Sequence, residues 1–247
     1  MNSNNTEPFA FSIDDLASRA SALHESYVSA DPFPHVVIDD FLPTGWAEKV
    51  LTVFPDKDSS VWLDWTERDT THQPKKQGIG DASRLTNVSP YLQSILFAFN
   101  SFPFLNFLEK LTGIGKLLPD PYFFGGGIQQ ILSGGKLSIH TDFNDLNSLD
   151  LYRRINVLQF LNKDWKSHYN GNLELWNLEL TSCVKSIAPV FNRLVVFNTT
   201  KKSFHGHPQT LNTPEDMTRK SIALYYYTAK PAPDEIYNCF TDWRDTP

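Results

Sequence analysis

Residues 127–142 read GIQQILSGGKLSIHTD, and this stretch decides the expected fold. Its apolar and β-branched residues predict one strand over 122–132 and another over 136–142. Ser133 and the two glycines after it supply the turn chemistry that separates the two runs. The pattern is therefore one of short strands bounded by turns.

The same pattern continues towards the C-terminus. Further strands are predicted over residues 153–161, 171–176, 184–188, 194–197, 204–207 and 219–228. Eight short strands separated by turns indicate a jelly roll, the double-stranded β-helix. The last of them is apolar on both sides, which is expected if helices cover the outer face of its sheet.

The N-terminal part has the periodicity of helices. Apolar residues recur at helical spacing over 12–27, and helices are also predicted over 40–54, 89–99 and 102–112, with a short strand over 34–38. The fold class is therefore mainly β with N-terminal helices. We expect a single domain over 1–247, with helical support and a lid region over 1–120, the jelly-roll core over 121–230 and a tail over 231–247.

Residues 55–87 lose this periodicity and are rich in polar residues around Trp62 and Trp65. A loop of this length is more often a functional segment than a plain connector. We expect it to act as a lid or binding segment, and a disordered surface excursion is the alternative. Trp62 and Trp65 would either close over the substrate or anchor the loop to the barrel.

Composition excludes several classes of protein. The formal charge is −6 and no long basic block occurs, so nucleic acid is not an expected partner. The two cysteines, Cys183 and Cys239, form no C-x-x-C pair and are expected to be reduced and partly buried thiols. No segment has the length of a membrane span or the pattern of a signal peptide, so a soluble, cytoplasmic protein without a membrane partner is expected. The sequence leaves the oligomeric state open.

His140 and Asp142 stand two positions apart on the second predicted strand. Side chains at this spacing point to the same face of a strand, so an imidazole and a carboxylate can converge on one metal ion. The pattern His-x-Asp is common by chance and becomes informative only with further ligands.

His205 supplies the third ligand. It opens the seventh predicted strand, and a jelly roll brings the inner ends of its second and seventh strands together. Two histidines and one carboxylate form the facial triad of non-haem iron(II) oxygenases, which leaves coordination positions open. His207 shares the strand parity of His205 and is the rival ligand, but it precedes Pro208, where the strand is expected to end.

Arg219 begins the eighth predicted strand, with Ser221 on the same face. The planar guanidinium binds a carboxylate through two parallel hydrogen bonds and stays charged when buried. Ser221 can donate another hydrogen bond to the same group. The alternative for Arg219 is a surface salt bridge.

These motifs resemble the 2-oxoglutarate/iron(II) oxygenase superfamily, and most of all its bacterial prolyl 4-hydroxylase-like branch. Residues 32–43, with the sequence PFPHVVIDDFLP, are also typical of that branch. The motifs that carry the likeness are residues 125–130 (GGGIQQ), 134–144 (GGKLSIHTDFN), 153–156 (RRIN), 161–162 (LN), 171–176 (GNLELW), 203–206 (SFHG) and 219–227 (RKSIALYYY).

The resemblance implies an enzyme that uses Fe(II), 2-oxoglutarate and O2, with ascorbate as a supporting reductant. His140, Asp142 and His205 would be both the metal ligands and the catalytic residues, and Arg219 and Ser221 would bind the cosubstrate. The implied reaction hydroxylates an unactivated C–H bond of a small molecule or of a prolyl or amino-acid-type substrate, free or in a peptide, and releases succinate and CO2.

The likeness also sets limits on the reaction. Related halogenases replace the triad carboxylate with a small residue, so Asp142 favours hydroxylation, with desaturation and cyclisation left open. Collagen-type prolyl hydroxylases usually carry lysine where Arg219 stands. This difference places the chain outside that subgroup and makes proline a doubtful substrate.

Three further residues are candidates for substrate contacts: Asn144, Arg154 and Gln130. Each could equally form a structural hydrogen bond. Two other functions stay open, because jelly rolls host many activities. A metal dioxygenase that does not use 2-oxoglutarate would not need Arg219, and a non-catalytic metal- or ligand-binding module would tolerate the loss of His140.

Overall fold

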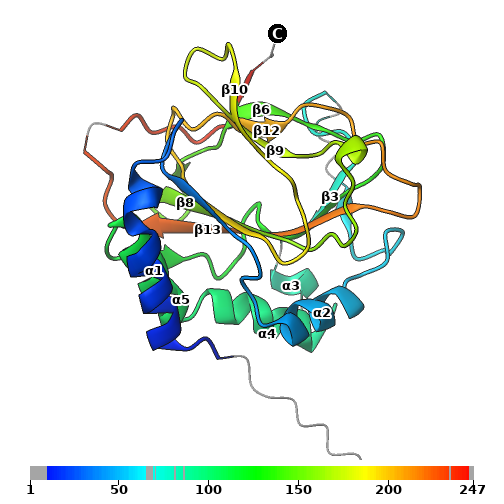
Figure 1. The fold of residues 1–247 in the computed structure, drawn as a ribbon, viewed down its shortest axis with the longest axis horizontal. Helices are drawn as coiled ribbons and strands as arrows, with labels where there is room; N and C mark the ends of the chain where they lie inside the picture. Colours follow the sequence, from blue (N-terminus) through cyan, green and yellow to red (C-terminus); the bar gives the residue numbers. More distant parts are fainter. Residues whose placement is uncertain are drawn as a thin grey trace, which may run out of the picture.

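The computed structural model of the protein describes residues 10–64, 69, 71–80, 82–85, 87–233 and 235–244. Its centre consists of two antiparallel sheets, which lie as separate layers in Figure 1. The five-stranded sheet has the order β10-β9-β12-β6-β14. Its strands are β6 (Leu137–Thr141), β9 (Leu173–Trp176), β10 (Cys183–Ile187), β12 (His205–His207) and β14 (Asp242–Arg244).

The nine-stranded sheet has the order β1-β11-β8-β13-β5-β3-β2, with β4 paired to β13 and β7 paired to β8. Its strands are β1 (His35–Ile38), β2 (Leu63–Asp64), β3 (Lys76–Ile79), β4 (Leu118–Pro119), β5 (Gly127–Ile131), β7 (Asp145–Leu146), β8 (Leu151–Phe160), β11 (Leu194–Asn198) and β13 (Arg219–Thr228). Each of the eight strand ranges predicted from the sequence overlaps a strand of the structure, and the predicted fold class is confirmed.

The helices pack on the outer face of the nine-stranded sheet, as predicted (Figure 1). They are α1 (Ile13–Val28), α2 (Thr44–Thr52), α3 (Ala82–Leu85), α4 (Pro90–Phe99) and α5 (Phe102–Thr112), with a short 3₁₀ helix, η1 (Ser167–Tyr169), elsewhere. Local sequence sets their ends. Ser12 caps α1 by accepting a hydrogen bond from the Asp15 amide at 3.3 Å. Gly113 ends α5 with φ +74°, a left-handed conformation that glycine adopts without strain.

The main core lies between these helices and the sheet. On β13, Ile222, Leu224 and Tyr226 belong to this core and point to the helices. A smaller apolar cluster fills the space between the two sheets and includes Phe160, Leu175 and Phe197. The two clusters thus cover both faces of the nine-stranded sheet with apolar side chains.

Two segments whose role was uncertain from the sequence each add strands to one of the sheets. Within 55–87, β3 pairs with β5, and Trp62 is buried against Phe54 with a ring separation of 5.7 Å. Trp65 lies outside the described residues, and the lid function of this segment stays a prediction. In the tail, β14 pairs with β6, so these residues pack on their own barrel.

Two other expectations concern the surface. Cys183 and Cys239 are free, as expected, but both are exposed rather than partly buried. Among the residues that the structure describes, no helix is long and apolar enough to cross a bilayer.

Phe104 lies at the centre of the helix–sheet core and gives a test of it. Its ring is fully buried, 4.9 Å from the Phe99 ring and 5.9 Å from that of Tyr226. We expect Phe104→Ala to lower the free energy of unfolding by about 3–5 kcal/mol, because it leaves a cavity in a packed core. Phe102→Ala is the control, since that ring is 67% exposed. Equal urea midpoints for the two variants would contradict this account of the core.

Candidate metal centre and its surroundings

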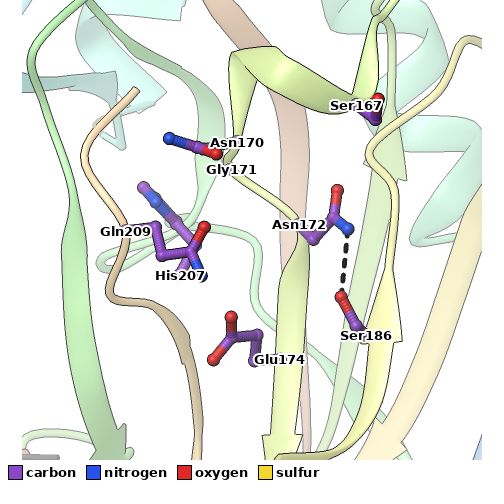
Figure 2. A pocket seen from close by; sticks show the side chains of 8 residues that line it. All are labelled: Ser167, Asn170, Gly171, Asn172, Glu174, Ser186, His207 and Gln209. Atoms are coloured by element: carbon purple, nitrogen blue, oxygen red, sulfur yellow. Dashed lines mark hydrogen bonds between the residues drawn. The ribbon is translucent and has the colours of Figure 1, made fainter. Parts of the chain in front are cut away.

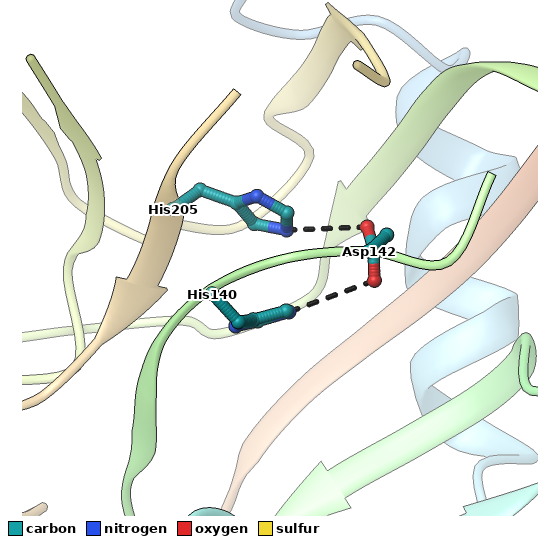
Figure 3. A group of neighbouring side chains, drawn as sticks. All are labelled: His140, Asp142 and His205. Carbon is teal, nitrogen blue, oxygen red and sulfur yellow. Dashed lines mark ion pairs between the residues drawn. The ribbon is translucent and has the colours of Figure 1, made fainter. Parts of the chain in front are cut away.

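Three side chains converge at one end of the space between the sheets. His140 lies on β6, Asp142 directly follows that strand, and His205 on β12 is the register partner of His140. One ligand atom from each residue lies within 4.8 Å of the others, and all three residues are buried (Figure 3). The Asp142 carboxylate is 3.6 Å from Nε2 of His140 and 3.4 Å from Nε2 of His205. The structure thus brings together the three ligands predicted from the sequence.

Backbone carbonyls orient both imidazoles. Nδ1 of His140 lies 2.8 Å from the Ser138 carbonyl oxygen, and Nδ1 of His205 lies 2.9 Å from that of Ser203. A carbonyl can only accept a hydrogen bond, so each Nδ1 must carry a proton. In the neutral ring, Nε2 then carries a lone pair that points towards the other two candidate ligands. This is the state in which an imidazole binds a metal.

Burial and the neighbouring His140 also favour the neutral ring of His205. Together they lower its pKa from 6.5 to about 4, although Asp142 and the Ser203 carbonyl oppose the shift. Near neutral pH this imidazole is therefore ready to coordinate a metal without first losing a proton.

Asp142 is held ionised by two side chains from β8. Its Oδ2 accepts hydrogen bonds from Nη2 of Arg153 at 2.9 Å and from Nδ2 of Asn156 at 2.6 Å. Burial alone would raise the pKa of Asp142, but Arg153 and the two histidines hold it well below its usual value. A charged carboxylate is the form that a metal ligand needs.

A bulge in β8 explains how Arg153 and Asn156, three positions apart, reach the same carboxylate. Tyr226 of β13 faces Ile155, while the next residue, Tyr227, faces Arg153, so Arg154 is the extra residue of β8. Bulges of this kind re-aim side chains next to active sites. The predicted candidate Arg154 instead lies 3.4 Å from the Thr228 hydroxyl, outside the triad.

The donor set fits a divalent ion of the iron type. Two imidazoles and one carboxylate match the facial triad, and the group contains no cysteine, so it does not resemble a structural zinc site. The orienting bonds to Nδ1 and to Asp142 are the supporting contacts that metal ligands commonly have. Of the two rival histidines, His205 belongs to this group and His207 does not.

Arg219 and Ser221 lie on the inner face at the start of β13, and both are buried. Nε of Arg219 donates to the Gly171 carbonyl oxygen at 2.7 Å, and the guanidinium lies 4.9 Å from the centre of the Phe160 ring. Burial lowers the pKa of Arg219 to about 9. In the part of the chain that the structure describes, no carboxylate forms an ion pair with it, so the surface salt bridge does not apply.

Two other candidates occupy structural positions. Asn144 ties down the tail by donating to the Ile236 carbonyl oxygen at 2.9 Å and accepting from the Asn238 amide at 2.8 Å. Gln130 is the register partner of Lys220, on the opposite face from Ser221, and donates to Gln77 at 2.7 Å. The structure brings neither to the triad, and their substrate contacts stay predictions.

An aromatic contact to the metal candidates was not predicted from the sequence. Trp243 of β14 is the register partner of His140, and their ring centres lie 4.7 Å apart. His72 stacks on the same indole with a ring separation of 4.9 Å. A tryptophan in a polar tail carries no local sequence signal for this, because the contact depends on long-range strand pairing.

Comparison with known proteins agrees with this geometry. The model of the 2OG-Fe(II) oxygenase superfamily matches residues 126–227, which confirms the resemblance seen in the sequence. A prolyl 4-hydroxylase structure from Phytophthora capsici is 22% identical, with a TM-score of 0.58 over 93% of this chain and 70% of that chain.

Two further solved structures share the fold. A prolyl hydroxylase from Trichoplax adhaerens, in complex with a hypoxia inducible factor peptide fragment, is 20% identical, with a TM-score of 0.58 over 86% of this chain and 91% of that one. HygX from Streptomyces hygroscopicus, with nickel and 2-oxoglutarate bound, is 12% identical, with a TM-score of 0.53 over 85% of this chain and 92% of that one. At these identities, the structures support the fold alone.

Replacement of Arg153 tests whether it prepares Asp142 for a metal. We expect Arg153→Met to weaken binding of Mn(II), measured by calorimetry, about 10- to 100-fold, because supporting partners of metal ligands have effects of this size. Arg154→Met is the matched control and should bind like the wild type. If the two variants bind Mn(II) equally well and both are folded by circular dichroism, Arg153 does not have this role.

The shifted pKa of His205 predicts a pH dependence of the metal-free protein. Between pH 6.5 and about 4, the unfolded chain binds a proton at this residue that the folded chain does not. Folding stability should therefore fall as the pH is lowered through this window. We expect the urea midpoint to drop more between pH 7 and pH 5 for the wild type than for His205→Gln. Equal drops would show that His205 is not a source of acid sensitivity.

Proposed function

We propose, on the premise that residues 126–227 are a 2OG-Fe(II) oxygenase domain, that this protein hydroxylates an unactivated C–H bond of a small molecule or of a prolyl or amino-acid-type substrate. The reaction would consume 2-oxoglutarate and O2 and release succinate and CO2. The observation that carries the proposal is a His-Asp-His group in the same interior as a buried arginine without an acidic partner among the described residues.

His140, Asp142 and His205 would hold Fe(II). When bound, the iron and 2-oxoglutarate together supply the oxidising chemistry, and the protein supplies orientation and exclusion of water. The backbone carbonyls of Ser138 and Ser203 fix the two rings, and Arg153 keeps the carboxylate charged and directed. Asp142 fills the carboxylate position of the triad, which favours hydroxylation.

Arg219 would bind the distal carboxylate of 2-oxoglutarate, with Ser221 beside it. A buried cation without a counter-charge is costly, so its retention in this interior calls for an anionic ligand. The bond from Nε to Gly171 and the contact with Phe160 fix the guanidinium. Its terminal nitrogens, which hydrogen-bond to none of the described residues, would bind that ligand. A metal dioxygenase that does not use 2-oxoglutarate would have no need of this arrangement.

The substrate would enter near Trp243 and His140, because the tail strand forms one wall next to the metal candidates. We keep both a peptide and a small molecule as substrate classes. The two exposed free thiols suit a reducing compartment, and a cytoplasmic location is part of the proposal.

Formation of succinate tests the function without knowledge of the substrate. Anaerobically purified protein would be mixed with Fe(II) and 2-oxoglutarate and then exposed to O2, with succinate measured by mass spectrometry. Slow uncoupled turnover should give succinate with the wild type and none with His140→Ala, which lacks a metal ligand. Arg219→Ala should lose most of the signal, because its cosubstrate would bind weakly.

Arg154→Ala serves as the control for loss of a positive charge and should retain the wild-type rate. Binding of Fe(II) and 2-oxoglutarate would be followed in parallel by their charge-transfer absorbance. Neither succinate nor absorbance with the wild type would refute the proposal and favour a non-catalytic binding module.

A further inference from the structure

His207 is a buried histidine on β12. The residue is 1% exposed, and neither ring nitrogen hydrogen-bonds to any residue that the structure describes. A buried polar group without a hydrogen bond costs free energy, so such groups call for a ligand or another explanation. The triad leaves this ring unused, because His207 is not among the candidate metal ligands.

The position of His207 points to the Arg219 end of the interior. The irregularity between β12 and β6 adds its extra residue to β6, since His205 faces His140 and His207 faces Leu137. The strand β12 therefore keeps its alternation, and His207 shares the inward face of His205. It lies farther from the triad along the strand.

Gly171 connects His207 with Arg219. The Gly171 carbonyl accepts the bond from Nε of Arg219. On the neighbouring strand, His205 faces Leu175 and Gly206 faces Glu174, so β12 runs along β9 towards Gly171 and His207 lies at that end. Gly171 and His207 also border a cavity of about 110 Å³, which Glu174 and Ser186 place on the outer face of the five-stranded sheet (Figure 2). A Cβ atom added to Gly171 would lie 3.2 Å from Cδ of Arg219, so the two residues are in close contact. The imidazole and the guanidinium thus lie at the same end of the barrel.

Lys76, the first residue of β3, faces the same end of the barrel as Arg219. Lys76 pairs with Ile131, and Ile131 pairs with Arg219, so the three side chains form one row on the inner face. Burial, with Arg153 and Arg219, lowers the pKa of Lys76 to about 8, while Asp142 opposes the shift. Asp142 is already paired with Arg153, so it does not neutralise Arg219.

We propose that His207, with Lys76 beside it, completes the site in which Arg219 holds the distal carboxylate of 2-oxoglutarate. The inference rests on the proposed function and deepens it by naming further residues that select a dicarboxylic 2-oxo acid. A neutral imidazole has one N–H, which donates to a carboxylate oxygen, while the guanidinium donates through its fork. Lys76 adds a second positive charge to the same space.

Binding of two keto acids tests the proposal directly. The wild type and His207→Leu, each loaded with Mn(II) and kept free of O2, would be titrated calorimetrically with 2-oxoglutarate and with 2-oxopentanoate, which lacks the distal carboxylate. We expect His207→Leu to bind 2-oxoglutarate about tenfold or more weakly, the range for a lost hydrogen bond to a charged group. Binding of 2-oxopentanoate should not change.

Matched controls separate this effect from general damage. His168→Leu replaces an exposed histidine and should behave as the wild type. Lys76→Met should also weaken 2-oxoglutarate selectively, whereas Lys75→Met, one position away and exposed, should not. If the leucine variant fails to fold, His207→Val gives the same comparison.

The possible failures are distinguishable. If the wild type does not bind 2-oxoglutarate, the proposed function itself is wrong. If the wild type binds it and Arg219→Met does not, but His207→Leu keeps wild-type affinity, only the present inference is overturned. It is also overturned if His207→Leu weakens Mn(II) binding before any keto acid is added, because the ring would then serve the metal.

Discussion

The centre of this protein depends on keeping one carboxylate charged inside a folded core. An isolated buried carboxylate would take up a proton, because burial raises its pKa. Asp142 remains ionised because Arg153 and Asn156 donate to the same oxygen at 2.9 and 2.6 Å. This triangle holds the end of β6 against β8 in the opposite sheet. The two histidines can converge on Asp142 only because that carboxylate is fixed in place.

The remainder of the fold serves to hold this contact rigid. The helices cover the outer face of the nine-stranded sheet, so β8 and β13 are packed on that side and directed inward on the other. An apolar cluster around Phe160 and Phe197 fills the space between the sheets. Strand alternation places Arg219 and Ser221 on the inner face of β13, where Ser221 faces Phe160 of that apolar cluster.

The sequence was sufficient for features that follow from local periodicity. Strand alternation placed His140 with Asp142, and Arg219 with Ser221, and the turn residues separated the strands. The bulge in β8 could not be foreseen, because it depends on the pairing with β13 and reverses the facing of Arg153 and Arg154. The contact of Trp243 with His140 likewise needs the tail to pair with a strand about a hundred residues earlier. Features of this kind arise from long-range register, which composition and spacing do not encode.

The distribution of charge along the interior gives the site a direction. Near the triad, the positive Arg153 is matched by Asp142, and the pair is neutral before any metal is bound. At the other end, Arg219 has no carboxylate partner among the described residues, and Lys76 lies in the same row. A molecule with one anionic end and one metal-binding end would be stabilised in a single orientation, because reversal would leave the buried arginine uncompensated. The position of Arg219 would thus set the orientation of the cosubstrate. The apolar Phe160 ring beside the guanidinium excludes water and so strengthens the attraction between the arginine and the anionic end of the cosubstrate.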